Sequence, residues 1–308
     1  MKKYVVCLIG PTASGKTQLA ITLSQLLHFE IISVDSAMIY RGLDIGTAKP
    51  TLQELKIIPH HLINICEIKV PYSCGQFYKD ALKKIELIHA KNRIPLLVGG
   101  TMLYFHILQH GFSDLPIAQP MLRKKIKKEA EAKGWIALYE KLKKIDPKSA
   151  LKINQKDAYR IERALEVYET TGQPLSNYQN LKRLEVLPYQ FINIIVSPTN
   201  REDLHQRIEK RFDQMLQKGF LEEVKQLYRR NLNPTLPALR TVGYRQAWQY
   251  FKGESSYETM RYKAIVATRQ LAKRQLTWLR RWPDAKWFDS NKKNLIKSII
   301  DYLINSGL

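Results

Sequence analysis

The sequence predicts an α/β fold with a parallel sheet core, a helical insertion and a helical C-terminal region. Short apolar runs alternate with helix-like segments in the first third of the chain, as in proteins built on a parallel sheet. A basic stretch of helix-forming residues then interrupts this alternation, and the chain is mainly helical after residue 196. We therefore expect a core formed by residues 1–115 and 190–308, with an insertion at residues 116–189.

Four short apolar runs are the expected core strands, at residues 4–9, 31–34, 94–98 and 191–196. A helix is expected from Lys16 to Leu27, where apolar residues recur at helical spacing. A second helix is expected from Met102 to Leu108, after the glycine pair and Thr101. The C-terminal region then opens with an apolar helical stripe, which consists of Leu204, Ile208, Phe212, Met215 and Leu216.

The amino-acid composition limits the classes of function that the protein can have. The 308 residues are 44% hydrophobic, enough for a full core, and the net charge of +22 indicates a polyanionic partner such as nucleic acid or a membrane surface. Apolar runs of membrane-spanning length are absent from the sequence, so a transmembrane helix is not expected. Cys7, Cys66 and Cys74 lack the paired spacing of a disulfide framework or zinc site, which favours buried thiols in the cytoplasm.

Two stretches hold much of the positive charge. Residues 121–163 contain fourteen Lys and Arg residues against six Asp and Glu residues, within the expected insertion. Residues 261–281 contain seven basic residues and no acidic ones. Because a solvated helix normally mixes both signs, the second stretch is expected to face an anion.

A phosphate-binding loop lies between the first expected strand and helix. The residues match the pattern G-x-x-x-x-G-K-[ST] and are Gly10, Pro11, Thr12, Ala13, Ser14, Gly15, Lys16 and Thr17. In this motif, backbone N–H groups surround a di- or triphosphate, the lysine neutralises its charge and the Thr17 hydroxyl can hold Mg²⁺. The sequence therefore predicts a P-loop NTPase-like core.

The expected acidic partner of such a loop is missing from its usual place. The apolar strand at 94–98 ends in Gly99 and Gly100, without the acid that positions Mg²⁺ in most phosphate-binding-loop enzymes. Asp35 instead follows the strand at 31–34, in the crevice where parallel sheets bind ligands. Three roles remain open at this point: a substitute Mg²⁺ ligand, a base acting on an acceptor, or a cap of the next turn.

Four blocks in order carry a resemblance to the tRNA dimethylallyltransferase family. They are GPTASGKT at 10–17, DSAMIYRGLDIGTAKP at 35–50, GGTMLY at 99–104 and RTVGYRQ at 240–246. The resemblance covers essentially the whole chain. It implies transfer of a dimethylallyl group from dimethylallyl diphosphate to N6 of the adenosine 3′ of the tRNA anticodon, with release of diphosphate.

The resemblance also implies roles for individual residues. Asp35 is the general base, and Thr101 lies at the reacting centre, with a helix N-cap as the alternative for Thr101. The phosphate-binding loop and Mg²⁺, held by Thr17, stabilise the leaving diphosphate. Arg207 and Arg211 are candidates for a diphosphate contact, Arg211 being the one we select, and intramolecular ion pairs are the alternative.

The resemblance further implies contacts with the anticodon stem-loop of tRNA. The segments concerned contain Asp35, Ser36, Ala37, Met38, Thr101, Arg123, Tyr159, Arg160, Ile161, Glu162, Arg163, Arg240, Thr241, Val242, Gly243, Tyr244, Arg245, Lys273, Arg274, Gln275, Leu276, Thr277, Trp278, Leu279 and Arg280. Many relatives have Gln at the position of Met38, so apolar contact or stacking is expected there in place of hydrogen bonding. For each basic residue a solvated face is the alternative, and Trp278 is expected to be a core anchor.

Three other functions compete with this interpretation. A small-molecule kinase explains the loop and Asp35 but not the charge of +22. A non-catalytic RNA-binding protein explains the charge but not Asp35 and Thr101 beside an intact loop. An adenylate isopentenyltransferase would act on a free nucleotide, which needs no extended basic surface. A monomer is the default expectation for the oligomeric state.

Overall fold

The computed structural model describes residues 2–111, 115, 116, 118–180 and 187–308. It forms two compact units, which we call the sheet unit (Met1–Gln109 with Leu187–Leu308) and the helical unit (His110–Val186). The sequence placed the insertion at 116–189. The last three of those residues lie in the sheet unit, because strand β5 begins at Tyr189.

The sheet unit is built on six parallel strands in the order β3-β2-β4-β1-β5-β6. Their bounds are β1 Lys3–Ile9, β2 Phe29–Val34, β3 His60–His61, β4 Ile94–Gly99, β5 Tyr189–Ser197 and β6 Ala285–Asp289. The four expected strands are confirmed as β1, β2, β4 and β5. The two edge strands were not expected, because β3 has two residues and β6 is half-exposed, so neither forms a continuous apolar run.

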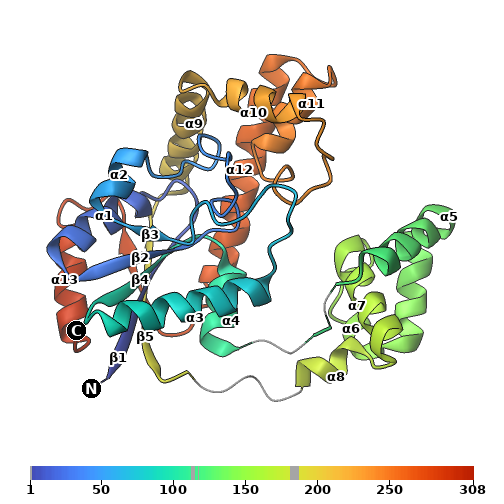
Figure 1. Ribbon diagram of the computed structural model, residues 1–308, viewed down its shortest axis with the longest axis horizontal. Helices are drawn as coiled ribbons and strands as arrows, with labels where there is room; N and C mark the ends of the chain where they lie inside the picture. The colour runs from blue at the N-terminus through green and yellow to red at the C-terminus, as the bar shows by residue number, and fades with distance from the viewer. Residues whose placement is uncertain (1, 112–114, 117, 181–186) are drawn as a thin grey trace. The chain divides into compact units, whose positions relative to one another are not determined.

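Helices cover both faces of the sheet (Figure 1). On one face, α1 (Lys16–Leu26) and α13 (Leu295–Asn305) pack against Val6 and Leu8 of β1. On the other face lie α3 (Cys74–Ala90) and α4 (Met102–His110), where Gln109 of α4 contacts the thiol of Cys7. The alternation of β1 side chains between the two faces follows from the two-residue period of a strand. A short helix, α2 (Leu52–Ile57), follows β2.

A second core of the sheet unit consists of helices. Its helices are α9 (Arg201–Gln217), α10 (Phe220–Arg229), α11 (Tyr244–Phe251) and α12 (Tyr257–Leu279). In Figure 1, α9, α10 and α11 gather at the end of this unit opposite the N-terminus. Ile39 and Leu43, from the loop after β2, are buried in the same cluster. That loop is therefore held by the C-terminal helices, nearly 200 residues away in sequence.

The helical unit has its own apolar core. Its helices are α5 (Pro120–Ile145), α6 (Pro147–Ala150), α7 (Ala158–Thr171) and α8 (Leu175–Asn180). Gly134 interrupts α5 with non-helical dihedral angles, so α5 is two helical segments joined at a kink. Their separate core is consistent with an independently packed insertion.

The described residues contain no helix that is both long enough and apolar enough to cross a lipid bilayer. All three cysteines are free, with Cys7 and Cys66 buried and Cys74 partly buried. The expectation of buried thiols is thus confirmed for Cys7 and Cys66.

Candidate active site

A cavity of about 670 Å³ opens in the sheet unit where the predicted motifs meet. The phosphate-binding loop, the turn after β2, the glycine pair after β4 and the segment before α11 all contribute to its wall. Predicted residues in the wall are Thr12, Ala13, Lys16, Thr17, Asp35, Ser36, Ala37, Met38, Thr101, Arg211, Arg240, Thr241, Val242, Gly243, Arg274, Gln275 and Trp278. The topology explains this gathering, because the carboxyl ends of parallel strands meet at one edge of the sheet.

The phosphate-binding loop joins β1 to α1, as its sequence predicts. Gly15 occupies the N-cap position of α1, and the Lys16 ammonium donates to the Pro11 carbonyl at 2.6 Å and the Ser14 hydroxyl at 3.2 Å. A Cβ atom on Gly10 would lie 2.2 Å from the Val196 carbonyl oxygen of β5. Only glycine therefore permits the loop to pass this close to the neighbouring strand.

Lys16 and Arg211 are two cations of the cavity wall whose pKa values are lowered by burial. Burial, together with the neighbouring Arg211 charge, lowers the pKa of Lys16 to about 7, and Asp35 opposes part of this shift. Burial likewise lowers the pKa of Arg211, again opposed by Asp35. Two desolvated cations that destabilise each other form a site whose charge an anionic ligand would balance.

Arg207 is directed elsewhere. Its guanidinium donates to the hydroxyl of Ser290 at 3.0 Å and to the side-chain oxygen of Asn291. Of the two arginines considered for a diphosphate contact, the structure therefore places only Arg211 in the cavity wall.

Asp35 and Thr101 meet at the turn after β2. One carboxylate oxygen of Asp35, Oδ1, accepts the N–H groups of Ala37 at 2.8 Å and Met38 at 3.3 Å, so Asp35 does cap the following turn. The Thr101 hydroxyl accepts the Ser36 N–H at 3.0 Å. These bonds hold the Asp35 carboxylate at the cavity wall, and this capping is compatible with a role as a base.

Gln275 joins the phosphate-binding loop to the glycine pair. Its side-chain oxygen accepts the Thr12 N–H at 2.9 Å, and its amide nitrogen donates to the Gly100 carbonyl at 2.8 Å. Gln275 is largely buried but lines the cavity, so its contact with tRNA stays a prediction. Its two hydrogen bonds contribute to the shape of the site.

Part of the cavity wall was not predicted. Apolar side chains of α9 and α12 line it, among them Ile208, Phe212, Met215 and Leu271. The helical stripe in the sequence indicated the first three as core residues, and periodicity alone cannot distinguish a core from a pocket wall. Gly46, Thr47 and Pro50 also line the cavity, and their only signal was their place in the block at 35–50.

Comparisons with known proteins find relatives that match almost the whole chain. The family model described as IPP transferase matches residues 38–282. A protein from Coxiella burnetii (strain Dugway 5J108-111), named tRNA dimethylallyltransferase, is 68% identical over 306 residues, which is 99% of this chain and 98% of that protein.

The chain belongs to the IPP transferase family.

Solved structures of other family members have the same fold. The tRNA isopentenylpyrophosphate transferase of Bacillus halodurans is 35% identical, with a TM-score of 0.73 over 99% of this chain and 96% of that chain. A eukaryotic dimethylallyltransferase described as acting on tRNA is 28% identical, with a TM-score of 0.80 over 99% of this chain and 80% of that chain. The expected α/β class is confirmed.

Several residues of the sheet unit that were predicted from the resemblance to contact tRNA are buried. Tyr244 and Leu279 have exposed fractions of 0%, so neither side chain can contact RNA directly. Leu276 packs against the helical core. Trp278, expected to be a core anchor, is 42% exposed and lines the cavity, so that expectation is wrong. Arg240, Arg245, Lys273, Arg274, Thr277 and Arg280 are exposed and remain predicted contacts.

The basic stretch at 261–281 does not face an external anion throughout. Arg261 forms ion pairs with Asp213 at 2.7 Å and Glu209 at 3.1 Å, and Arg269 pairs with Glu209 at 3.0 Å. Acidic residues on α9 therefore neutralise part of α12. The sequence could not reveal this, because the partners lie about 50 residues away.

The structure also corrects predictions about basic and neighbouring residues of the helical unit. Ile161 and Glu162 are buried, and Arg123 and Arg163 bind the buried carboxylate of Glu166 rather than facing solvent. Two residues of this predicted set are exposed, Tyr159 and Arg160. They remain predicted RNA contacts.

The donor set in the cavity fits Mg²⁺ bound together with a diphosphate. Thr17 and Asp35 present hydroxyl and carboxylate oxygens, the ligand type that Mg²⁺ prefers. No group of three or more His, Cys, Asp or Glu side chains in the described part of the chain could hold a metal ion. Most ligands of such an ion would therefore be diphosphate oxygens and water.

Proposed function

We propose that this chain is a tRNA dimethylallyltransferase that transfers the dimethylallyl group of dimethylallyl diphosphate to N6 of the adenosine 3′ of the anticodon. One observation carries the proposal: a single cavity combines two desolvated cations, a carboxylate and an apolar wall. These features suit, respectively, a diphosphate, an amino group that must lose a proton, and a five-carbon chain. The family membership supports the same reaction.

In the proposed reaction, the N6 lone pair forms a bond to C1 of the dimethylallyl group as the C1–O bond breaks. The bonding electron pair leaves with the diphosphate, and the N6 proton passes to the Asp35 carboxylate. A positioned carboxylate contributes about 10²- to 10⁴-fold to such a step. The turn that holds Asp35 through Ala37 and Met38 supports this role, because the carboxylate is oriented before the acceptor binds.

The leaving group gains negative charge in the transition state. Lys16, Arg211 and the backbone N–H groups of residues 13–17 are the groups that would stabilise it. Mg²⁺, with Thr17 as its protein ligand, would supply additional positive charge at the diphosphate oxygens. Gln275 links the phosphate-binding loop to the Gly100 carbonyl, which supports a preorganised diphosphate site.

The acceptor side of the proposal uses the exposed basic residues. A base stacked in an anticodon loop must be extruded to reach the cavity. Arg240, Arg245, Lys273, Arg274 and Arg280 are exposed on the sheet unit, and Tyr159 and Arg160 are exposed on the helical unit. Phosphate contacts of this kind position the RNA without reading its sequence. We further propose that the protein is a cytoplasmic monomer. Light scattering would test the monomeric state, and cell fractionation would test the location.

The test is transfer of radiolabel from dimethylallyl diphosphate in the presence of Mg²⁺. Three acceptors are offered in parallel: an unmodified tRNA with adenosine 3′ of its anticodon, free AMP, and a small alcohol with ATP. Label in the tRNA alone is the expected result. Label in AMP would indicate an adenylate isopentenyltransferase, and ATP consumption without label would indicate a kinase.

Asp35→Asn tests the assignment of the base. It keeps the shape and one hydrogen-bond acceptor but removes the proton-accepting charge, so turnover should fall by about 10²- to 10⁴-fold with little change in tRNA affinity. Asp301→Asn makes the same chemical change at an exposed position of α13 and should have no effect. Near-normal turnover in Asp35→Asn would show that the base assignment is wrong.

A further inference from the structure

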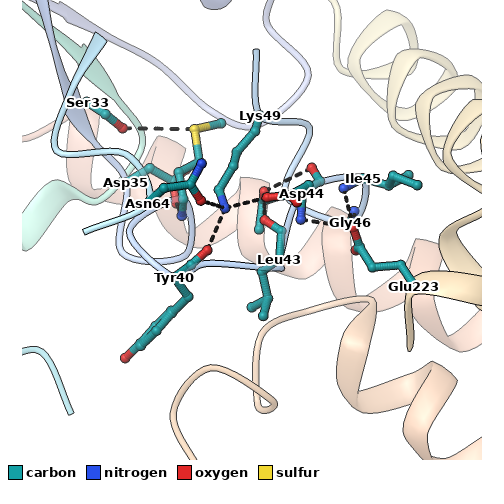
Figure 2. Close-up of polar contacts among 12 residues, drawn as sticks. Ser33, Asp35, Tyr40, Leu43, Asp44, Ile45, Gly46, Lys49, Asn64 and Glu223 are labelled. Carbon is teal, nitrogen blue, oxygen red and sulfur yellow. Dashed lines mark hydrogen bonds and ion pairs between the residues drawn. The ribbon is translucent and has the colours of Figure 1, made fainter. Parts of the chain in front are cut away.

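A single carboxylate organises the loop that follows the Asp35 turn. The N–H groups of Asp44 and Ile45 donate to one oxygen of Glu223 at 3.0 and 2.8 Å, and that of Gly46 donates to the other oxygen at 3.2 Å. Figure 2 shows the Glu223 side chain reaching from α10 to this stretch of backbone. Three successive N–H groups that converge on one carboxylate form a tight, charge-assisted contact.

Glu223 also binds Tyr244, at the start of α11. The phenol of Tyr244 donates to the same oxygen as Gly46, at 2.5 Å. Burial and the neighbouring Glu223 charge raise the pKa of Tyr244, so the phenol stays protonated as a donor. Tyr244 directly follows the cavity-lining segment 240–243, and it is fully buried. One carboxylate therefore joins two segments that line the site.

Packing enforces the same contact. A Cβ atom on Gly46 would lie 2.4 Å from the ring of Phe220 and 2.5 Å from the ring of Tyr244. The backbone of the loop thus rests directly on both rings. Only a residue without a side chain allows Gly46 to approach them closely enough for its N–H to reach Glu223.

Lys49 fixes the other end of the loop. Its side chain is 3% exposed, and its ammonium donates to the Tyr40 carbonyl at 2.5 Å, to Asn64 at 2.6 Å and to Asp44 at 2.7 Å. Figure 2 shows these three oxygens around the Lys49 nitrogen. The Asn64 N–H in turn donates to the Met38 carbonyl, in the turn that carries Asp35. Hydrogen bonds therefore connect the region around Glu223 with the Asp35 turn.

We propose that Glu223 is a positioning residue of the transfer reaction, which holds loop 44–46 against the segment 240–244 and so fixes the Asp35 turn relative to the acceptor side of the cavity. This inference rests on the proposed function. Glu223 does not line the cavity, so it acts through the backbone that it binds. A displacement of about 1 Å at a reacting group costs on the order of 10²-fold in rate.

The test is Glu223→Gln, compared with Glu222→Gln in the full chain. Both changes remove one charge from the first turn of α10, but Glu222 is exposed. We expect kcat for tRNA to fall about 10- to 100-fold in Glu223→Gln, with the KM for dimethylallyl diphosphate changed by less than about threefold. Glu222→Gln should match the wild type. Rates are normalised to the fraction of molecules that bind inorganic diphosphate, which corrects for unfolded protein.

A merely structural role makes a different prediction. Glu223→Gln would then lower the melting temperature and the diphosphate-binding fraction, while the normalised kcat stayed equal to that of Glu222→Gln. That result would overturn the inference. Absence of label transfer by the wild-type chain would instead refute the proposed function, so the two failures are distinguishable.

Tyr244→Phe supplies a second, milder variant. It retains the ring that packs on Gly46 and removes only the hydroxyl that binds Glu223. If the two residues act through one contact, the double variant should lose little more kcat than Glu223→Gln alone. Multiplicative losses in the double variant would contradict a shared positioning role.

Discussion

The Glu166 carboxylate joins several segments of the helical unit, and replacing it with the neutral glutamine should destabilise that unit. Its carboxylate is fully buried and accepts the Gln119 N–H at 2.8 Å, two bonds from Arg123 at 2.8 and 2.9 Å, and one from Arg163 at 2.6 Å. Breaking a buried pair costs about 3–5 kcal/mol. The arginine side chains are 24% and 21% exposed, so water would relieve part of this, and we expect about 2–3 kcal/mol for Glu166→Gln.

Native-state hydrogen exchange of the α5 and α7 amides measures this cost locally. A loss of about 2–3 kcal/mol corresponds to roughly 30- to 150-fold faster exchange through unit opening. Glu140→Gln is the control, because Glu140 and its partner Lys143 are both about half exposed and solvent screens such a surface pair. Equal exchange rates in the two variants would refute this role of Glu166.

The stability that Glu166 contributes to the helical unit should change with pH in a defined direction. Burial raises the pKa of Glu166, but the hydrogen bonds from Arg123, Arg163 and the Gln119 backbone more than offset it and hold the pKa below its ordinary value of 4.5. A depressed pKa in the folded state adds stability above the ordinary value and loses it as the pH falls through the folded value. The difference between wild type and Glu166→Gln should therefore be full at pH 7 and shrink below pH 4.5.

Three further predictions concern the sheet unit and RNA binding. Because the pKa of Lys16 is about 7, the affinity for inorganic diphosphate, measured by calorimetry, should fall about tenfold per pH unit above pH 7. Lys16→Arg should lose this pH dependence. Equal pH dependence in both proteins would contradict the role of Lys16. Arg160→Glu, at a side chain 65% exposed, should weaken tRNA binding and reduce the slope of log affinity against log salt by about 1, whereas an unchanged affinity at low salt would return Arg160 to a solvated face. Gly46→Ala should lower stability by about 1–3 kcal/mol in thermal unfolding, because its Cβ would overlap two rings, and an unchanged melting temperature would contradict that packing.

The sequence predicted the parts of the site that depend on local pattern. The phosphate-binding loop needs glycines, a lysine and a threonine at fixed spacing between a strand and a helix, and all of these are adjacent in sequence. Asp35 could be placed at the same edge because it follows a strand of the same parallel sheet. The edge strand β6 was missed, because half-exposed residues such as Lys286 and Trp287 do not give an apolar run.

Assignments that depend on long-range ion pairs could not be made from the sequence. Arg123, Arg160 and Arg163 occur within similar basic, helix-forming sequence, yet Arg160 is exposed while the other two bind Glu166. Net charge describes the unit as a whole and does not identify which cations are neutralised internally. For the same reason, the lack of acidic residues in 261–281 did not predict a free basic face, because α9 supplies the acids.

The loop at 44–46 illustrates why a motif can be recognised before its mechanism is understood. The block at 35–50 was selected for its resemblance, but nothing within it explains why Gly46 must be glycine or which group accepts the N–H groups of residues 44–46. The explanation lies in Phe220, Glu223 and Tyr244, which are nearly 180 to 200 residues away in sequence. The half-buried Glu223 carboxylate satisfies three backbone N–H groups, and its removal leaves these donors unpaired. The geometry of the Asp35 turn therefore depends on contacts across the sheet unit, and Glu223→Gln, at a residue that does not line the cavity, should alter the rate of transfer.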